Sequence, residues 1–157
     1  GNPIDEAGHS GSIEVRGPGV APCYWGDEPR YTDEWFSTLD VGVFDSDMCL
    51  HILGRASRVI NTGGELVSPI RVEEALRTLE SVVDCCVLGL KDEIWGQIVA
   101  AALIPASDQR PSLRELREEL NEALAPWQHP RSIVWVDALP QTTTGKVDIS
   151  KVSQLFK

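Results

Sequence analysis

The sequence has no long apolar run and few basic residues. Its 157 residues include 14 Lys and Arg against 24 Asp and Glu, which gives a net charge of 14 − 24 = −10. A chain this acidic is a poor match for phosphate backbones, so no nucleic-acid partner is expected. No apolar run approaches the ~18–20 residues that cross a bilayer, so no membrane span is expected either. The apolar fraction of 42% is nevertheless enough for a globular core.

The sequence also lacks paired metal-ligand or redox cysteines. Its four cysteines are Cys23, Cys49, Cys85 and Cys86, none of them in a C-x-x-C pair, and no histidine lies at zinc-ligand spacing. No metal site is therefore predicted. Cys85 and Cys86 adjoin inside an apolar run, which indicates core positions. Unpaired cysteines of this kind are typical of a reduced, cytoplasmic compartment.

Charge and residue pattern both change near residue 55. Residues 1–54 carry ten acids and two arginines, a net charge of −8, whereas residues 55–157 carry fourteen acids and twelve bases, a net charge of −2. The first stretch contains short segments typical of antiparallel strands at 12–16, 35–38, 41–44 and 49–53, and its prolines and glycines predict irregular surface at 20–34. The second stretch mixes strands with helices, so the sequence predicts two units that meet near Arg55.

In the second stretch, turn and cap residues indicate where the elements begin. Thr62-Gly63-Gly64 is typical of the turn of a hairpin over 58–67. Ser68-Pro69 favours a helix start, and Ser112 favours a second helix, expected to run through Leu124. The other predicted elements are strands at 82–88, 97–104 and 132–136 and a terminal helix at 148–156.

Three segments, 35–40, 53–65 and 139–147, have residue patterns that indicate a functional rather than a purely structural role. A polar threonine run ends in Gly145-Lys146, where the lysine is a mobile charge able to reach a phosphate or carboxylate. Gly63 and Gly64 allow another molecule to approach the backbone closely. Structural alternatives stay open: a solvated turn for Lys146, a plain hairpin turn for the two glycines, and surface charges for Arg55 and Arg58.

The order of these segments resembles the C-terminal part of the adenylate-forming acyl-CoA synthetase superfamily, which includes acyl- and aryl-CoA ligases, carrier-protein adenylation domains and luciferases. Residues 35–40, Trp-Phe-Ser-Thr-Leu-Asp, look like the family's W-[FY]-x-T-G-D motif. Residues 54–69 look like G-R-x-x-D-x-I-x-x-G-G-E-x-[IV]-x-P, and residues 139–146 look like L-P-x-T-x-[ST]-G-K. Two further matches, at 11–24 and 92–96, extend the resemblance over nearly the whole chain.

The resemblance implies an α+β fold in two domains joined by a hinge. Residues 1–54 match the last β subdomain of the family's large domain, a small antiparallel β-barrel-like remnant. Residues 55–57 match the hinge, with Ser57 at its pivot. Residues 58–157 match the C-terminal AMP-binding-enzyme lid domain, with an N-terminal hairpin, a roughly three-stranded sheet and flanking helices. The family rotates this lid between two half-reactions.

The resemblance also implies roles for single residues. Asp40 matches the aspartate that hydrogen-bonds the ribose hydroxyls of ATP, and Arg55 matches an arginine that contacts the nucleotide. Lys146 matches the lysine that reaches the α-phosphate and carboxylate, where its charge offsets the negative charge growing at phosphorus. The loop that lines the pantetheine tunnel in the second half-reaction is matched by Gly63, Gly64 and Glu65.

The implied function is that of an ATP-dependent carboxylate–CoA ligase, which forms an acyl-AMP and transfers its acyl group to CoA. ATP with Mg²⁺ and CoA are the implied substrates, and the Mg²⁺ ligands are not expected among these residues. Two alternatives remain open: an adenylation domain or acyl-AMP ligase that loads a carrier-protein pantetheine, and a non-catalytic interaction domain. Leu39, where the motif has Gly, and Ser57, where the hinge has Asp or Lys, favour the last.

The family's phosphate loop and acyl pocket lie in its large N-terminal domain. No [ST]-S-G-[ST]-T-G-x-P-K segment occurs in this sequence. The isolated chain is therefore expected to be inactive, and its own N-terminal domain is the expected partner. Because the acyl pocket is not included, the sequence does not indicate which acid is used.

Overall fold

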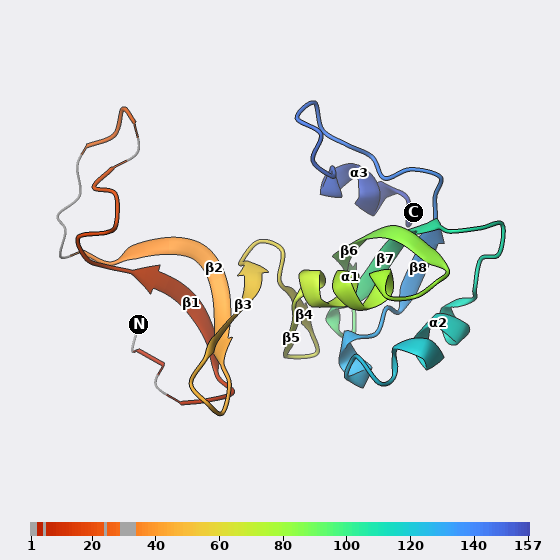
Figure 1. Ribbon diagram of the computed structural model, residues 1–157, viewed down its shortest axis with the longest axis horizontal. Helices are drawn as coiled ribbons and strands as arrows, with labels where there is room; N and C mark the ends of the chain where they lie inside the picture. Colours follow the sequence, from red (N-terminus) through yellow and green to blue (C-terminus); the bar gives the residue numbers. More distant parts are fainter. Residues whose placement is uncertain (1–2, 5, 24, 29–33) are drawn as a thin grey trace. The chain divides into compact units, whose positions relative to one another are not determined.

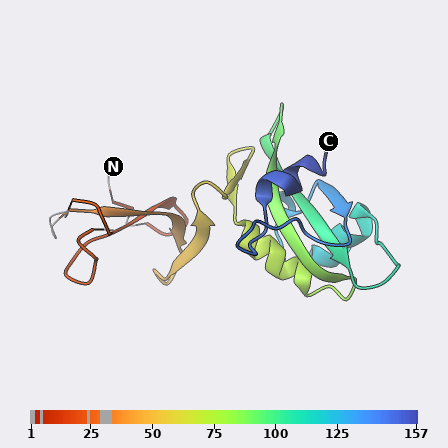
Figure 2. The ribbon, with the colours of Figure 1, turned by 90° about the horizontal axis from the view of Figure 1, so that it is seen from above.

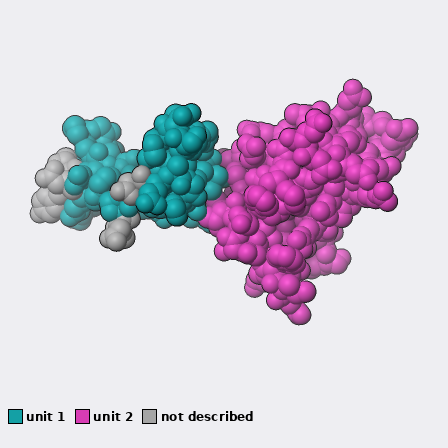
Figure 3. Space-filling view, turned by 90° about the horizontal axis from the view of Figure 1, so that it is seen from below, with its two compact units in different colours: residues 1–57 teal, residues 58–157 magenta. Residues whose placement is uncertain are grey.

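The backbone divides into two compact units, Gly1–Ser57 and Arg58–Lys157 (Figure 3). The structure is a computed structural model that describes residues 3–4, 6–23, 25–28 and 34–157. The segment 20–34, predicted from its prolines and glycines to be irregular surface, lies partly outside the described residues. Each unit is described below by itself.

The first unit is an open three-stranded antiparallel sheet. Its strands, in the order β1-β2-β3, are β1 (Ser10–Val15), β2 (Phe36–Phe44) and β3 (Leu50–Arg55) (Figure 1). The described strands do not close into a barrel, so the barrel-like remnant expected from the resemblance is an open sheet here. The separate strands expected at 35–38 and 41–44 form the single long strand β2.

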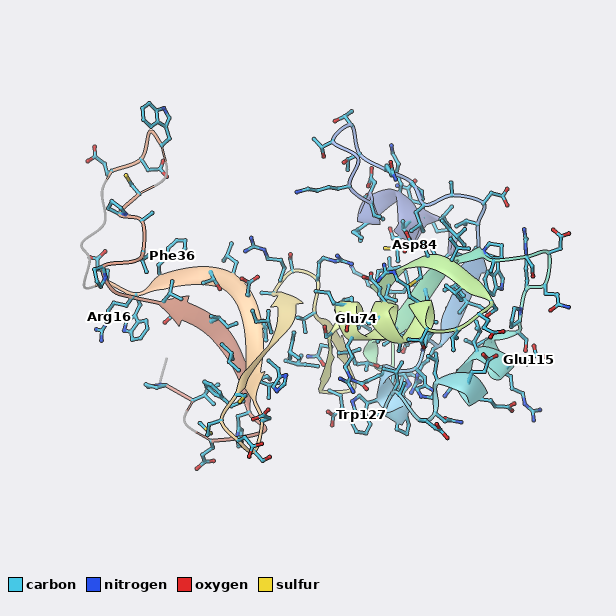
Figure 4. The ribbon with its side chains drawn as sticks, in the orientation of Figure 1. Arg16, Phe36, Glu74, Asp84, Glu115 and Trp127 are labelled. Carbon is cyan, nitrogen blue, oxygen red and sulfur yellow. The ribbon has the colours of Figure 1, made fainter. Side chains whose placement is uncertain are left out.

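The first unit buries little apolar surface. Every fully buried apolar side chain of the described residues lies in the second unit. In the first unit, Ile52 and Trp35 remain 64% and 58% exposed. The Arg16 guanidinium lies 4.5 Å from the centroid of the Trp35 ring, a cation–π contact near the surface (Figure 4). So small a core gives the sheet little hydrophobic stabilisation of its own.

The second unit is built on one mixed sheet of five strands. The strands are β4 (Ile60–Thr62), β5 (Glu65–Val67), β6 (Val82–Asp92), β7 (Gly96–Pro105) and β8 (Ser132–Trp135). The main order is β5-β4-β7-β6, with β8 parallel to β7. The predicted α+β class is confirmed, but the hairpin expected beside a three-stranded sheet joins that sheet through the pair Thr62 and Gly96.

Three helices pack on this sheet, and side-chain caps fix their starts. They are α1 (Pro69–Arg77), α2 (Leu113–Leu120) and α3 (Ile149–Gln154), with a short 3₁₀ turn, η1 (Pro126–Gln128), after α2. The predicted Ser68 cap is confirmed, because its hydroxyl accepts the Arg71 N–H. Ser112 and Glu115 form a reciprocal capping box at the start of α2 (Figure 4). Helix α2 ends at Leu120, four residues earlier than predicted.

Both faces of the central strands are buried, which explains their nearly continuous apolar sequence. Successive side chains alternate between faces, so Cys85 and Val87 pack with α1 and α2, whereas Cys86 and Leu88 pack with α3. Figure 2 shows these helices covering the two sides of the sheet. Of the helices that the structure describes, none is both long and apolar enough to cross a membrane.

Candidate functional site

In the first unit, Asp40 and Arg55 lie side by side on paired strands. They are direct partners in the register of β2 and β3, and Arg55 Nε lies 3.4 Å from Asp40 Oδ1. Arg55 Nη1 also donates to the carbonyl oxygen of Thr38. The two side chains are 30% and 59% exposed, so both can reach a ligand. The structure thus brings together the two residues that the sequence associated with a nucleotide.

The residue before Asp40 has a left-handed backbone. Leu39 has φ = 63°, a conformation that favours glycine, and its side chain is 65% exposed. Hydrogen bonds hold this geometry from both sides: the Asp40 N–H donates to Thr38 Oγ1 at 3.2 Å, and the Ala56 N–H donates to the Leu39 carbonyl oxygen at 2.8 Å. The left-handed backbone of Leu39 therefore sets the position from which the Asp40 side chain extends.

Ser57 is the last residue of the first unit, and fixed residues precede and follow it. Ala56 is bonded to Leu39 within the first unit, as above. In the second unit, Arg58 Nη2 lies 3.3 Å from both Glu73 Oε1 and the Val87 carbonyl oxygen. Ser57 itself is exposed. Ser57 thus lies in the turn 56–58, between a residue bonded to the first unit and a residue whose side chain is bonded to the second.

The partners of Arg58 could not be recognised in the sequence. The side chain of Glu73, on α1, is only 12% exposed, and its Oε1 also accepts the Val87 N–H at 2.9 Å. Arg77 lies 3.9 Å from Glu73 Oε2 and 2.9 Å from Asp84, which is labelled in Figure 4. Glu73 follows Arg58 by 15 residues, so no local pattern links them.

The two adjacent glycines form the turn between β4 and β5. Gly63 and Gly64 have φ values of 63° and 94°, which explains why side-chain-free residues occur there. The Gly64 N–H donates to Asn61 Oδ1 at 3.1 Å. Gly63, Gly64 and Glu65 are all exposed, so the turn presents backbone and one carboxylate to its surroundings.

Lys146 lies at the end of a second, hydrogen-bonded turn of the same unit. The Thr142 N–H donates to the Lys146 carbonyl oxygen at 2.7 Å, and the Gly145 N–H donates to the Thr142 carbonyl oxygen at 3.0 Å. A bridge between Gln141 and Val147 closes the base of this turn. Lys146 is exposed, and no acidic side chain within the described ranges pairs with its ammonium group. Its charge is available to an anion.

Cys85 and Cys86 are buried thiols with low reactivity. Burial raises the pKa of the Cys85 thiol to about 12 and that of Cys86 to about 11, so neither forms a thiolate near neutral pH. Across the described part of the chain, no three His, Cys, Asp or Glu side chains gather where they could hold a metal ion.

Comparison with known proteins shows what this chain is similar to. Residues 71–146 match the AMP-binding enzyme C-terminal domain family. Feruloyl-CoA synthase from Amycolatopsis sp is 35% identical over 99% of this chain, and oxalate–CoA ligase from Arabidopsis thaliana is 32% identical over 98%. The chain spans 32% and 30% of these two relatives, about a third of their length.

Solved structures give the same result. The anthranilate CoA ligase AuaEII, in complex with anthranoyl-AMP, matches 97% of this chain at 31% identity with a TM-score of 0.75, over 31% of its own length. The amide bond synthetase McbA from Marinactinospora thermotolerans matches 97% at 31% identity with a TM-score of 0.76, over 32% of its length. Residues 71–146 therefore belong to the AMP-binding enzyme C-terminal domain family, and nearly the whole chain is similar to part of adenylate-forming CoA ligases.

Proposed function

We propose that this chain is the C-terminal part of an ATP-dependent carboxylate–CoA ligase. A carboxylate attacks the α-phosphorus of ATP and displaces pyrophosphate, which gives an acyl-AMP. The sulfur of CoA then attacks the acyl carbon and displaces AMP. The observation that carries this proposal is the match of nearly the whole chain, both units included, to relatives named as CoA ligases.

The nucleotide contacts in the first unit are assigned to Asp40 and Arg55. A carboxylate with exposed oxygen atoms can accept hydrogen bonds from two neighbouring ribose hydroxyls. Arg55 holds that carboxylate from one side at 3.4 Å and, being 59% exposed, keeps donors for the nucleotide itself. The pair would therefore orient the nucleotide without taking part in bond making.

Lys146 is assigned to the first half-reaction. Negative charge grows on the α-phosphate oxygens as the carboxylate attacks, and an ammonium group placed there lowers the barrier. The closed base of the Lys146 turn supports this role, because it fixes the backbone while the long side chain stays mobile. Mg²⁺ bound to ATP is expected to take its protein ligands from the N-terminal domain.

Ser57 is assigned as the pivot between the two half-reactions. Support comes from the hydrogen bonds of Ala56 within the first unit and of the Arg58 side chain within the second, because Ser57 is the residue between them and is exposed. The domain boundary proposed is accordingly 1–54, hinge 55–57 and lid 58–157. The Asp or Lys usual at the hinge contributes charge, whereas serine contributes only rotational freedom.

Gly63, Gly64 and Glu65 are assigned to the pantetheine arm of the thiol substrate. Two glycines at positive φ expose peptide groups without side chains, which lets a narrow chain pass close to the backbone. The thiol carrier is taken to be CoA itself, with a carrier-protein pantetheine as the other source of the same arm. The four free cysteines fit a reducing, cytoplasmic compartment.

A second candidate is transfer of the acyl group to an amine. It is favoured by one observation: the amide bond synthetase McbA matches the chain as well as the CoA ligase AuaEII does. The first half-reaction is common to both candidates, so the acceptor alone separates them. AMP release that depends on CoA supports the ligase, whereas release that depends on an amine and not on CoA supports the amide synthetase.

The test uses the full-length protein that contains this chain. A panel of aromatic and aliphatic acids is screened for pyrophosphate exchange, and thioester formation from supplied acyl-AMP is measured separately. Lys146→Ala should lower exchange by about 10²–10³-fold and spare thioester formation, because an electrostatic contact used in one step is lost. Lys157→Ala, also an exposed lysine, is the matched control. Equal loss in both steps would contradict the assignment, and the 157-residue chain alone should give no exchange.

A further inference from the structure

Trp95 contacts the glycine turn with both its backbone and its ring. The Gly63 N–H donates to the Trp95 carbonyl oxygen at 2.9 Å. A Cβ atom at Gly63 would lie 2.6 Å from Cε3 of the indole, far closer than atoms can approach. The ring thus fills the space that a side chain at position 63 would occupy, and Gly63 is required for packing as well as for its positive φ.

Trp95 is itself held from two other directions. The Arg131 guanidinium carbon lies 4.2 Å from the centroid of the indole, a cation–π contact. Asp92 Oδ1 accepts the N–H groups of both Ile94 and Trp95 at 2.9 Å, which fixes the turn between β6 and β7. Yet the Trp95 side chain is 41% exposed, so burial alone does not account for an indole here.

The glycine turn has few other attachments to the sheet. Strands β4 and β5 have three residues each, and Thr62 with Gly96 is the one register pair that joins β4 to β7. The Asn61 N–H adds a bond to Gln97 Oε1 at 2.8 Å. Hairpins this short are mobile unless neighbours hold them. The contacts of Trp95 are therefore a large part of what holds the tip of the hairpin.

We propose that Trp95 is a positioning residue that holds the Gly63–Gly64 turn in one conformation, so that its backbone is preorganised for the pantetheine arm in thioester formation. The link to thioester formation rests on the proposed function, whereas the structural restraint does not. Loss of the ring would leave the Gly63 hydrogen bond in place but open space beside it. The turn would then sample several conformations, and only the second half-reaction would slow.

The restraint is tested by hydrogen exchange on the 157-residue chain. Trp95→Ala should accelerate exchange at the amides of Gly63 and Gly64 by about tenfold, since local opening becomes easier. Trp95→Phe should lie between Trp95→Ala and the unsubstituted chain. Ile94→Ala is the matched control, because its side chain is 85% exposed in the same turn. Unchanged protection at Val87 shows that the fold is intact. Equal exchange at Gly63 and Gly64 in Trp95→Ala and the control would overturn the proposal.

The catalytic link is tested in the full-length protein. Trp95→Ala should lower thioester formation from acyl-AMP by about tenfold while pyrophosphate exchange stays unchanged, because misplacement affects only the step that uses the turn. Trp95→Phe should recover most of that rate. A slower thioester step without faster amide exchange would mean that the ring contacts substrate directly, and would overturn the positioning role. If the unsubstituted protein adenylates no acid, the proposed function fails while the exchange experiment still decides the restraint.

Discussion

Replacement of Glu73 by alanine should destabilise the second unit strongly. Strand β6 is at the end of the strand order, so the amides on its outer edge have no strand partner. Glu73 Oε1 accepts one such amide, the Val87 N–H, at 2.9 Å and pairs with Arg58 at 3.3 Å. The substitution removes both contacts at a side chain that is 12% exposed.

The magnitude follows from these contacts. A hydrogen bond to a charged acceptor contributes about 1.5–3 kcal/mol, and the half-exposed pair with Arg58 adds at most about 1 kcal/mol. Together they give a loss of about 1.5–4 kcal/mol, and a loss of about 2 kcal/mol lies within that range. For a domain of this size, such a loss lowers Tm by roughly 8–16 °C.

Urea unfolding of the 157-residue chain measures this loss, with hydrogen exchange at Val87 as a local probe. Glu74→Ala is the matched control, because Glu74 is exposed on the same helix (Figure 4). Glu73→Gln keeps an oxygen for the Val87 N–H and should recover about half of the stability, since only the charge is lost. If Glu73→Ala cost no more than Glu74→Ala, the edge of β6 would not depend on Glu73.

Three further results are expected. Burial raises the pKa of Cys85 to about 12 and that of Cys86 to about 11, from 9.0. The two buried thiols therefore contribute their full stability below pH 9, and this contribution declines as the pH rises above 9. Urea midpoints should fall over that alkaline range. Hydrogen bonds from Ser112 lower the pKa of Glu115 below 4.5, so its contribution is present above pH 4.5 and disappears as the pH falls through the folded pKa. Glu115→Gln should reduce the change of the urea midpoint with pH over that acidic range. Leu39→Gly should stabilise the first unit by about 0.5 kcal/mol in urea unfolding, because glycine removes the strain of the left-handed backbone, and this gain exceeds the cost of a more flexible unfolded chain. Leu39→Ala keeps the strain and should not stabilise the unit.

Local patterns predicted most elements of the second unit. The apolar runs at 82–88 and 97–104 are strands because both faces of the sheet are covered, and Ser68 and Ser112 cap helices as expected. The predicted end of α2 is wrong for a physical reason. Leu124 is buried against the same core as Leu116, so its apolar character continued the helical period although the chain had already turned at Asn121.

Contacts between distant residues were not predictable from spacing. The pair Thr62 and Gly96 merges hairpin and sheet, yet neither residue is apolar or part of an alternating run. For Arg58 a surface charge stayed open as an alternative, because its partner Glu73 lies 15 residues further along the chain, on α1. Trp95 was seen only as part of a motif, and its contact with Gly63 depends on how two turns meet. Such pairings are set by tertiary packing rather than by local propensity.

The unusual Leu39 shows how a sequence departure can change energy without changing geometry. From the sequence, Leu39 in place of the glycine of the motif was one of two residues that favoured a non-catalytic domain. In the structure, Leu39 takes the glycine-like φ of 63° and points its side chain to solvent. The bonds at Asp40 and Ala56 outweigh a strain of about 1–2 kcal/mol for one left-handed residue. Asp40 therefore lies directly opposite Arg55 in the strand register although Leu39 replaces the glycine of the motif.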